Sequence, residues 1–196
     1  MNLDPYNNIR MPRIKTIEPE LAVGRLKEIY DDLLEKRGKI AAVHQIQSLR
    51  PESIRQHMDL YMEIMFSRSE LSRAEREMIA VVVSAANQCP YCIAHHGEAL
   101  NNYWKNKPKV ENLATDFLSL ALEPREMAMC RFANLLTKNP GAHEDHDHTD
   151  MLRKAGLSDE AILDVVLVIA YFNFVNRIVL SLGVEIEAGG GKGYKY

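Results

Sequence analysis

Apolar residues recur along most of the chain with the three- and four-residue spacing of amphipathic helices. One such stretch opens at Glu18-Pro19 and ends near Gly38; its apolar positions are Leu21, Leu26, Ile29, Tyr30, Leu33 and Leu34. A second stretch opens at Pro51; its apolar positions are Ile54, Met58, Tyr61, Met62 and Met65. Proline suits the first helical turn, because the N–H that it lacks would have no intrahelical partner there. Both stretches are therefore predicted to be helices.

Capping residues and prolines mark further helix starts. Ser72 and Glu75 have the spacing of a capping box, in which each side chain binds the backbone N–H of the other residue. Pro108 and Pro124 are typical of first turns, and Ser158 precedes the longest apolar run. No stretch alternates as a half-buried strand does, and the valines at 81–83 lie inside a helical pattern. The sequence predicts an all-α, compact multi-helix fold of about eight helices.

The domain organisation is expected to be simple. We predict one helical domain over residues 1–188, with its core motif at 71–100, and a flexible Gly-rich tail at 189–196. A shift of 86 positions places Leu71-Ser72 on Leu157-Ser158 and Asn87 on Asn173. This match suggests two related helix pairs, of which only the first carries reactive side chains. Chance similarity between two capped apolar helices explains the match equally well.

Composition and charge exclude several classes of function. The 196 residues have a net charge of −3, and the basic patch of a nucleic-acid-binding protein is missing. Met1 to Lys15 has no apolar core of the signal-peptide kind. The most apolar run, Ala161 to Phe172, looks too short to span a bilayer and contains Asp164. We expect a cytoplasmic protein that binds neither membranes nor nucleic acid.

The chain contains three cysteines, at positions 89, 92 and 130. A low, odd number argues against the disulfide framework of a secreted protein. Cys130 lies among apolar residues and is expected in the core. In a reducing compartment, a close pair such as Cys89 and Cys92 indicates redox chemistry or metal binding.

The pair stands where a new helix is expected to begin. A helix from about Ser72 to Ala86 is broken by Asn87-Gln88, which makes Cys89 the N-cap and places Cys92 in the next first turn. Free N–H groups and the positive end of the helix dipole favour a thiolate there. They lower the pKa of a cysteine from its ordinary value of about 8.5. The thiolate attacks peroxides or disulfides, and the second sulfur then closes a disulfide.

An acid and an imidazole accompany the two thiols. Glu77 lies twelve residues before Cys89 and His96 four residues after Cys92. If the two helices fold back on each other at the break, Glu77 and His96 reach the same level and form a proton relay with the thiols. His95 is expected to support the site through a hydrogen bond.

Each of these residues also has a structural explanation. The two cysteines are small enough to be core residues, and Glu77 has the alternative of an exposed helix carboxylate. With His96, the cysteines would also supply three zinc ligands. The segment 143–148, His-Glu-Asp-His-Asp-His, resembles a metal site in composition but follows a loop signal, and a solvated acidic loop is the preferred interpretation.

Glu77, Cys89-x-x-Cys92 and His96 together resemble the signature of the alkyl hydroperoxidase D branch of the carboxymuconolactone decarboxylase-like family. The run 170–177, Ala-Tyr-Phe-Asn-Phe-Val-Asn-Arg, resembles the peroxidase-related subgroup of that family. The likeness extends from about residue 13 to about residue 187. It implies an all-helical thiol peroxidase that uses no cofactor and no metal.

The resemblance also implies roles and partners. By position, Cys92 corresponds to the thiol that attacks the peroxide and Cys89 to the resolving thiol, while Glu77 and His96 relay the activating proton. The best-known branch has a histidine between the cysteines where this chain has Tyr91, whose hydroxyl is the candidate replacement. The implied partners are a hydroperoxide and a dithiol reductant, either a lipoyl or a thioredoxin-like protein. The implied assembly is a homo-oligomer, a trimer or hexamer, with a dimer as the alternative.

Two other functions stay open. Relatives that decarboxylate a muconolactone share the fold but lack the cysteine pair, so the presence of Cys89 and Cys92 argues against a lyase. The third reading is an oligomeric module without catalytic activity that senses redox state through the same disulfide.

Overall fold

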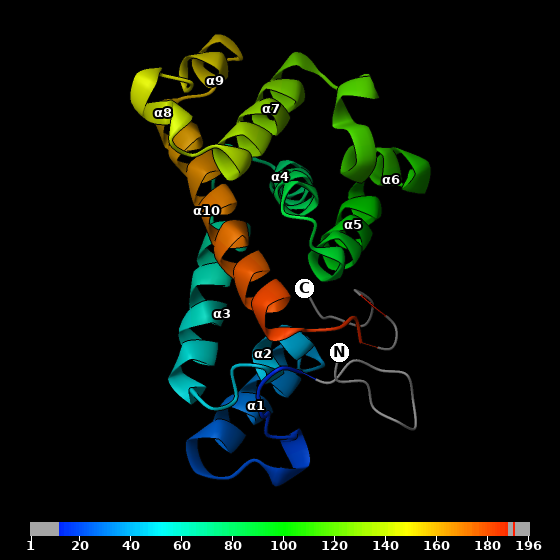
Figure 1. The fold of residues 1–196 in the computed structure, drawn as a ribbon, viewed down its shortest axis with the longest axis vertical. Coiled ribbons are helices and arrows are strands. Elements are labelled where there is room, and N and C mark those ends of the chain that lie inside the picture. Colours follow the sequence, from blue (N-terminus) through cyan, green and yellow to red (C-terminus); the bar gives the residue numbers. More distant parts are fainter. Residues whose placement is uncertain (1–11, 188–189, 191–196) are drawn as a thin grey trace.

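The computed structural model describes residues 12–187 and residue 190, and in that part of the chain every regular element is helical (Figure 1). The α-helices are α1 (Gly24–Arg37), α2 (Ala42–Gln45), α3 (Pro51–Phe66), α4 (Arg73–Ala86), α5 (Pro90–Trp104), α6 (Lys107–Asp116), α7 (Pro124–Lys138), α8 (Ala142–Asp145), α9 (Asp150–Lys154) and α10 (Asp159–Leu182). Short 3₁₀ turns, η1 (Pro19–Leu21) and η2 (Phe117–Ser119), complete the set. The predicted all-α fold is confirmed. The predicted tail, 189–196, lies outside the described residues except for Gly190.

Most predicted helix boundaries are confirmed by their local hydrogen bonds. Ser72 N donates to Glu75 Oε2 at 2.7 Å and Glu75 N donates to Ser72 Oγ at 3.2 Å, which completes the capping box of α4. Gly38, with φ of 82°, ends α1 in the left-handed conformation that glycine adopts without strain. One boundary was predicted wrongly: α1 begins at Gly24, not at Pro19, because Val23 is extended and interrupts the helix.

The central element is α4, which lies in the middle of Figure 1 and packs against α5, α6, α7 and α10. Residues 76–84 of α4 are all buried. A helix that is surrounded on all sides must hold its polar side chains in satisfied hydrogen bonds. A smaller apolar cluster joins α1 to α3; it consists of Ala22, Leu26, Ile29, Tyr30, Leu33 and Ile54.

The longest helix, α10, runs along much of the molecule beside α3, α4 and α7 (Figure 1). An 18-residue window of this 24-residue helix has a mean hydropathy of 2.0, so the helix is longer than the apolar run that was expected to be too short to cross a membrane. Ten of its residues are buried against the other helices. This packing is that of a core helix, which passes the same test of length and composition.

The structure does not repeat the α4–α5 helix pair in the C-terminal half. The matched segment is one uninterrupted helix, α10, which continues through Asn173, whereas the chain turns at Asn87. The two asparagines are instead hydrogen-bond partners: Asn87 Nδ2 donates to Asn173 Oδ1 at 3.0 Å. The predicted pair of related halves therefore does not describe this fold.

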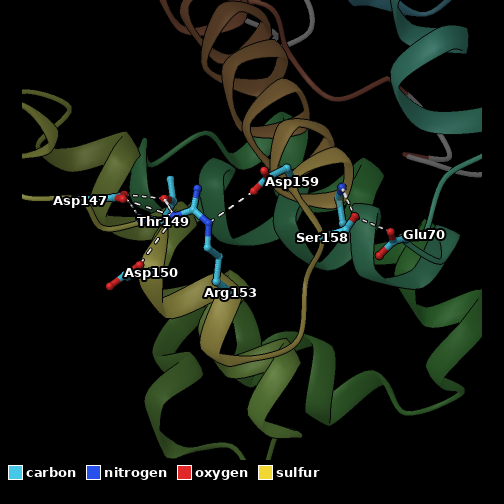
Figure 2. Close-up of polar contacts among 8 residues, drawn as sticks. Glu70, Asp147, Thr149, Asp150, Arg153, Ser158 and Asp159 are labelled. Atoms are coloured by element: carbon cyan, nitrogen blue, oxygen red, sulfur yellow. Dashed lines mark hydrogen bonds and ion pairs between the residues drawn. The ribbon is translucent and has the colours of Figure 1, made fainter.

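A polar network fastens the start of α10 (Figure 2). Arg153 binds Asp147, Asp150 and Asp159 through its guanidinium group. The Ser158 hydroxyl caps Ala161 N and also contacts Glu70, in the loop before α4. These contacts fix the beginning of α10 relative to α4, which positions both helices at the site described next.

Candidate active site

A three-residue turn between α4 and α5 determines the geometry of the site. Gln88 adopts a left-handed conformation with φ of 55°, and Cys89 N donates to Ser84 O at 2.9 Å. Cys89 is the N-cap of α5, and Pro90 occupies the first helical position, as the sequence predicted. The chain therefore reverses direction within one turn, and the second half of α4 lies against the first half of α5.

Glu77 and His96 meet across this helix pair, as predicted. His96 Nδ1 lies 2.7 Å from Glu77 Oε2, and the Glu77 side chain is fully buried. Arg73 binds the other carboxylate oxygen, with Nε and Nη2 at 3.0 and 2.5 Å from Oε1. Arg73 is held in turn by Met65 O, at 2.8 Å from Nη1. The exposed carboxylate considered for Glu77 is thereby excluded.

These contacts fix the protonation of the acid and the tautomer of the imidazole. Burial on its own would raise the pKa of Glu77, but the attraction of His96 and Arg73 outweighs it and lowers that pKa. An ionised carboxylate only accepts hydrogen bonds, so Nδ1 of His96 carries the hydrogen between them. In a neutral His96, Nε2 is consequently free to accept a proton. This is the arrangement of a positioned general base.

Both cysteine sulfurs are buried and free of disulfides. The pKa of Cys89 is lowered, chiefly because Cys92 donates a hydrogen bond to its sulfur and the N–H groups of Cys92 and Tyr91 add two more. The pKa of Cys92 is raised because it keeps its proton beside the Cys89 thiolate and is buried. The pair therefore loses its first proton easily and its second with difficulty.

A cavity of about 80 Å³ adjoins Cys92 and His96, and Cys89 does not line it. Apolar surface dominates its wall, to which α2, α3, α5 and α10 contribute. The aromatic and imidazole side chains in the wall are His44, His57, Tyr61, Tyr91, His95, His96, Tyr171 and Phe172. Phe172 packs edge-on against His96, with 4.4 Å between ring centroids. Of the two sulfurs, Cys92 is thus the one that a bound molecule meets.

Sequence reasoning missed the role of Asn176 beside the cysteines. This residue of α10 is fully buried, and its hydrogen bond to Cys92 lowers the pKa of that thiol. Its Nδ2 also lies 3.3 Å from Ser84 Oγ, and its Oδ1 accepts from Asn87 Nδ2 at 3.0 Å. The available signal was an asparagine inside a strongly apolar helix, because a buried amide requires hydrogen-bond partners.

Tyr91 and His95 point toward the C-terminal segment. Tyr91 Oη donates to Glu187 Oε1 at 2.9 Å, and His95 Nε2 lies 2.8 Å from Glu187 Oε2. The Ala42 N–H also donates to Glu187 Oε1, at 2.9 Å. The Tyr91 hydroxyl therefore contacts Glu187, and its replacement of a relay histidine stays a prediction. The hydrogen bond expected of His95 is present, and its supporting role in the site stays a prediction. Glu187 is a further residue that the sequence did not reveal.

The remaining candidates lie outside this site. Cys130 is fully buried in the core, as predicted, and burial raises its pKa to about 12. Residues Ala142–Asp145 form a helical turn, and His143 packs against Phe132 with 5.2 Å between ring centroids. Within the described residues, three or more histidine, cysteine or acidic side chains nowhere converge in a way that would hold a metal ion. Cys89, Cys92 and His96, which were considered as three zinc ligands, likewise do not form such a group.

A family model matches the part of the chain that carries this geometry. The model of the carboxymuconolactone decarboxylase family matches residues 51–135, from the start of α3 into α7. The matched region contains both cysteines of the pair together with Glu77 and His96. This part of the chain is therefore similar to the carboxymuconolactone decarboxylase family.

Solved structures extend the likeness to nearly the whole chain. An uncharacterized peroxidase-related protein with an alkylhydroperoxidase AhpD core, from Ralstonia eutropha JMP134, is 28% identical, with 92% of this chain and 94% of that chain covered and a TM-score of 0.81. An uncharacterized peroxidase-related protein from Silicibacter sp. TM1040 is 26% identical. The match covers 100% of this chain and 99% of that chain, with a TM-score of 0.78. The chain therefore resembles peroxidase-related proteins over nearly its whole length.

The same fold also occurs in a debrominase. A cysteine-to-alanine variant of the debrominase Bmp8, solved in complex with 2,3,4-tribromopyrrole, is 21% identical, with 90% of this chain and 92% of that chain covered and a TM-score of 0.73. At this level of identity, the likeness concerns the fold and not the reaction.

Proposed function

We propose that this protein is a thiol-dependent peroxidase, an oxidoreductase that reduces hydroperoxides with the Cys89–Cys92 pair. The observation that supports the proposal most strongly is the contact of 2.7 Å between Glu77 and His96 beside a cavity that Cys92 lines. A buried carboxylate, an oriented imidazole and a thiol at one cavity make up an activated nucleophile.

The reaction begins at Cys92. In the form of the pair in which Cys89 keeps its proton, His96, oriented by Glu77, accepts the proton of the Cys92 thiol, so that the pair carries one negative charge. The thiolate attacks the terminal oxygen of the hydroperoxide, so that an S–O bond forms and the O–O bond breaks. Sulfur is oxidised to a sulfenic acid, and the leaving alkoxide takes the proton back from His96 as an alcohol.

Cys89 completes the oxidative half of the cycle. Its thiolate attacks the sulfenic sulfur of Cys92, an S–S bond forms, and hydroxide leaves as water after taking a proton from solvent. The hydrogen bond between the sulfurs supports this order, because it keeps the resolving thiolate in contact with its target. An external dithiol then reduces the disulfide, and a lipoyl or thioredoxin-like protein has the appropriate chemistry. The proposed location is the cytoplasm, where such reductants are available.

The assembly that we propose is a homo-oligomer, with the outer face of α10 as the candidate contact surface. Leu163, Leu167 and Phe174 lie on this face and are 57%, 40% and 47% exposed. Their spacing places them in one stripe along the helix. Large apolar side chains aligned on a surface are typical of protein–protein contacts.

The proposal is tested by mixing pre-reduced protein with one equivalent of cumene hydroperoxide. We expect the peroxide to be consumed and mass spectrometry to find a Cys89–Cys92 disulfide. Cys92→Ser should abolish consumption, whereas Cys89→Ser should allow one turnover and leave a sulfenic acid that a dimedone reagent traps. Cys130→Ala is the matched control, since Cys130 is a buried thiol outside the site and should react no differently from the unaltered protein.

Other outcomes would contradict the proposal. Unchanged peroxide consumption in Cys92→Ser removes Cys92 from the reaction. Decarboxylation of a muconolactone by a protein without the cysteine pair would favour the lyase. A disulfide that forms only once and that no dithiol reduces with turnover would favour a redox sensor. A brominated pyrrole belongs in the substrate panel, because the fold also serves a debrominase.

A further inference from the structure

A second hydrogen-bonded chain reaches the cavity wall and is not used by the relay described above. Tyr171 Oη lies 2.7 Å from His57 Nε2, and His57 Nδ1 lies 2.8 Å from Gln47 Nε2. Gln47 Nε2 also donates to Val43 O, at 2.7 Å. These residues come from α3, α10 and the segment after α2, and Tyr171 and His57 both line the cavity together with Cys92.

The backbone carbonyl of Val43 fixes the direction of every hydrogen bond in this chain. A carbonyl oxygen only accepts, so the Gln47 atom beside Val43 O must be the amide nitrogen. The second hydrogen of that nitrogen then points at His57 Nδ1, which must be the accepting nitrogen. Burial lowers the pKa of His57 to about 4, so the imidazole is neutral near pH 7 and has one N–H, on Nε2. That N–H donates to the Tyr171 oxygen.

The hydroxyl hydrogen of Tyr171 consequently points away from His57. Among the described residues, no acceptor lies within hydrogen-bond distance of it, although the Tyr171 side chain is only 6% exposed. A buried donor of this kind is costly unless a ligand or water satisfies it. Burial raises the pKa of Tyr171 well above its ordinary value, and the nearby Tyr61 and Cys92 raise it further. The hydroxyl therefore keeps its hydrogen.

We propose that Tyr171 is a catalytic residue that donates a hydrogen bond to the leaving oxygen of the hydroperoxide, and that His57 and Gln47 are the residues that position it. This inference rests on the proposed function. As Cys92 attacks the terminal oxygen, negative charge develops on the other peroxide oxygen. The Tyr171 O–H stabilises that charge without transferring its hydrogen, while His96 supplies the proton that makes the alcohol. The two imidazoles thus have opposite tautomers, one accepting a proton and the other orienting a donor.

The test compares Tyr171→Phe with the unaltered protein, since phenylalanine keeps the ring and removes only the hydroxyl. We expect kcat/KM for cumene hydroperoxide to fall about 100-fold, the lower end of the loss that follows removal of one donor to a developing anion. Reduction of the Cys89–Cys92 disulfide by dithiothreitol should keep its rate, because no alkoxide leaves in that half-reaction. Tyr103→Phe, at a tyrosine that is 53% exposed, is the control.

A change in packing alone would not alter the dependence on the leaving group. Across hydroperoxides whose alcohols differ in acidity, Tyr171→Phe should show a steeper loss of rate as the alcohol becomes less acidic. Gln47→Leu should show the same change to a smaller degree, because His57 is then free to present its other tautomer. Equal rates and equal slopes in the Tyr171→Phe variant and the unaltered protein would overturn the role of Tyr171 and leave the peroxidase intact.

Binding of the product separates this inference from the proposed function. In a Cys92→Ser background, Tyr171→Phe should weaken binding of cumyl alcohol about 5- to 10-fold, the value of one hydrogen bond to a neutral oxygen. Equal affinities would refute the donor whether or not the protein turns over peroxide. Failure of the unaltered protein to consume any hydroperoxide would instead refute the peroxidase, and the role of Tyr171 at a leaving oxygen with it.

Discussion

The Nδ1 atom of His96 lies 2.7 Å from Oε2 of Glu77, although the two residues are 19 positions apart and belong to different helices. Arg73 occupies the other carboxylate oxygen, so Glu77 stays ionised inside the core. The carboxylate therefore serves two purposes. It balances a buried guanidinium group and fixes the imidazole tautomer that accepts a proton from Cys92.

Replacing Glu77 should affect activity and stability together. In Glu77→Gln, we expect kcat/KM for a hydroperoxide to fall about 100-fold, because His96 loses its orienting anion. The free energy of unfolding should fall by about 3–5 kcal/mol, since Arg73 is left without its counter-charge. Stopped-flow kinetics and urea unfolding measure the two effects. Glu75→Gln, on the same helix, keeps a residue that completes a capping box and loses the ion pair with Arg125, so it should cost about 1 kcal/mol or less and leave kcat/KM unchanged.

The cysteine pair should titrate as a unit. Ultraviolet thiolate absorbance against pH should show one proton lost below the ordinary range of a free cysteine, because the Cys92 hydrogen bond stabilises the Cys89 thiolate. Cys92→Ala should move the titration of Cys89 upward. Cys89→Ala should make Cys92 easier to ionise than it is beside the Cys89 thiolate. Identical titration of Cys89 with and without Cys92 would contradict the hydrogen bond between the sulfurs.

Asn176 should connect the stability of the helix packing to the reactivity of Cys92. Asn176→Leu keeps the branched shape but removes the hydrogen bonds of Asn176 to Ser84 and Asn87, so the free energy of unfolding should fall by about 1–3 kcal/mol. The pKa of Cys92 should rise further, because the hydrogen bond that lowers it is gone. Alkylation rates against pH and chemical unfolding measure these effects. An unaltered alkylation profile would show that Asn176 acts on packing alone.

The α10 stripe should govern self-association. Leu167→Glu places a charge in the middle of the exposed apolar face, and we expect sedimentation to show a lower oligomer order at the same protein concentration. Leu118, on η2, is 58% exposed and provides the matched control as Leu118→Glu. If both variants sediment like the unaltered protein, the contact surface lies elsewhere.

The contact between Glu77 and His96 was predictable because both residues belong to one helix hairpin. Its hinge is visible in the sequence as Asn87-Gln88 followed by Pro90, and the rise per residue then brings the acid and the imidazole level. Helix starts were predictable for the same local reason. The other site residues could not be predicted, because their positions depend on how the helices pack. Asn176 and Glu187 are far from the motif in the sequence and contact it only in the folded structure.

The beginning of α1 was predicted too early, because an apolar residue was counted as part of a helix face that does not exist. Leu21 has a suitable spacing for the apolar face of a helix, but its side chain is 71% exposed in the structure. An apolar residue at the right interval does not reveal whether a partner surface exists for it. The first helical residue that contacts the apolar cluster between α1 and α3 is Leu26, and the helix begins only two residues before it.

Glu187 should tie the C-terminal segment to the cysteine motif in a pH-dependent manner. Burial opposes its ionisation, but hydrogen bonds from His95 and the Ala42 N–H hold its pKa at about 2, below the ordinary 4.5. A carboxyl whose pKa is depressed by folding stabilises the folded state above the unfolded-state pKa. That contribution disappears as the pH falls from about 4.5 toward 2.

The variant Glu187→Gln should therefore lower Tm at neutral pH by a few degrees, and the gap from the unaltered protein should close as the pH falls through this window. Thermal unfolding at a series of pH values measures the gap. Hydrogen exchange at the Ala42 amide should also become faster in Glu187→Gln, since that N–H loses its charged acceptor. Glu160→Gln, at an exposed residue of α10, is the control. A gap that persists below pH 3 would show that Glu187 stabilises the segment by packing and not by its charge.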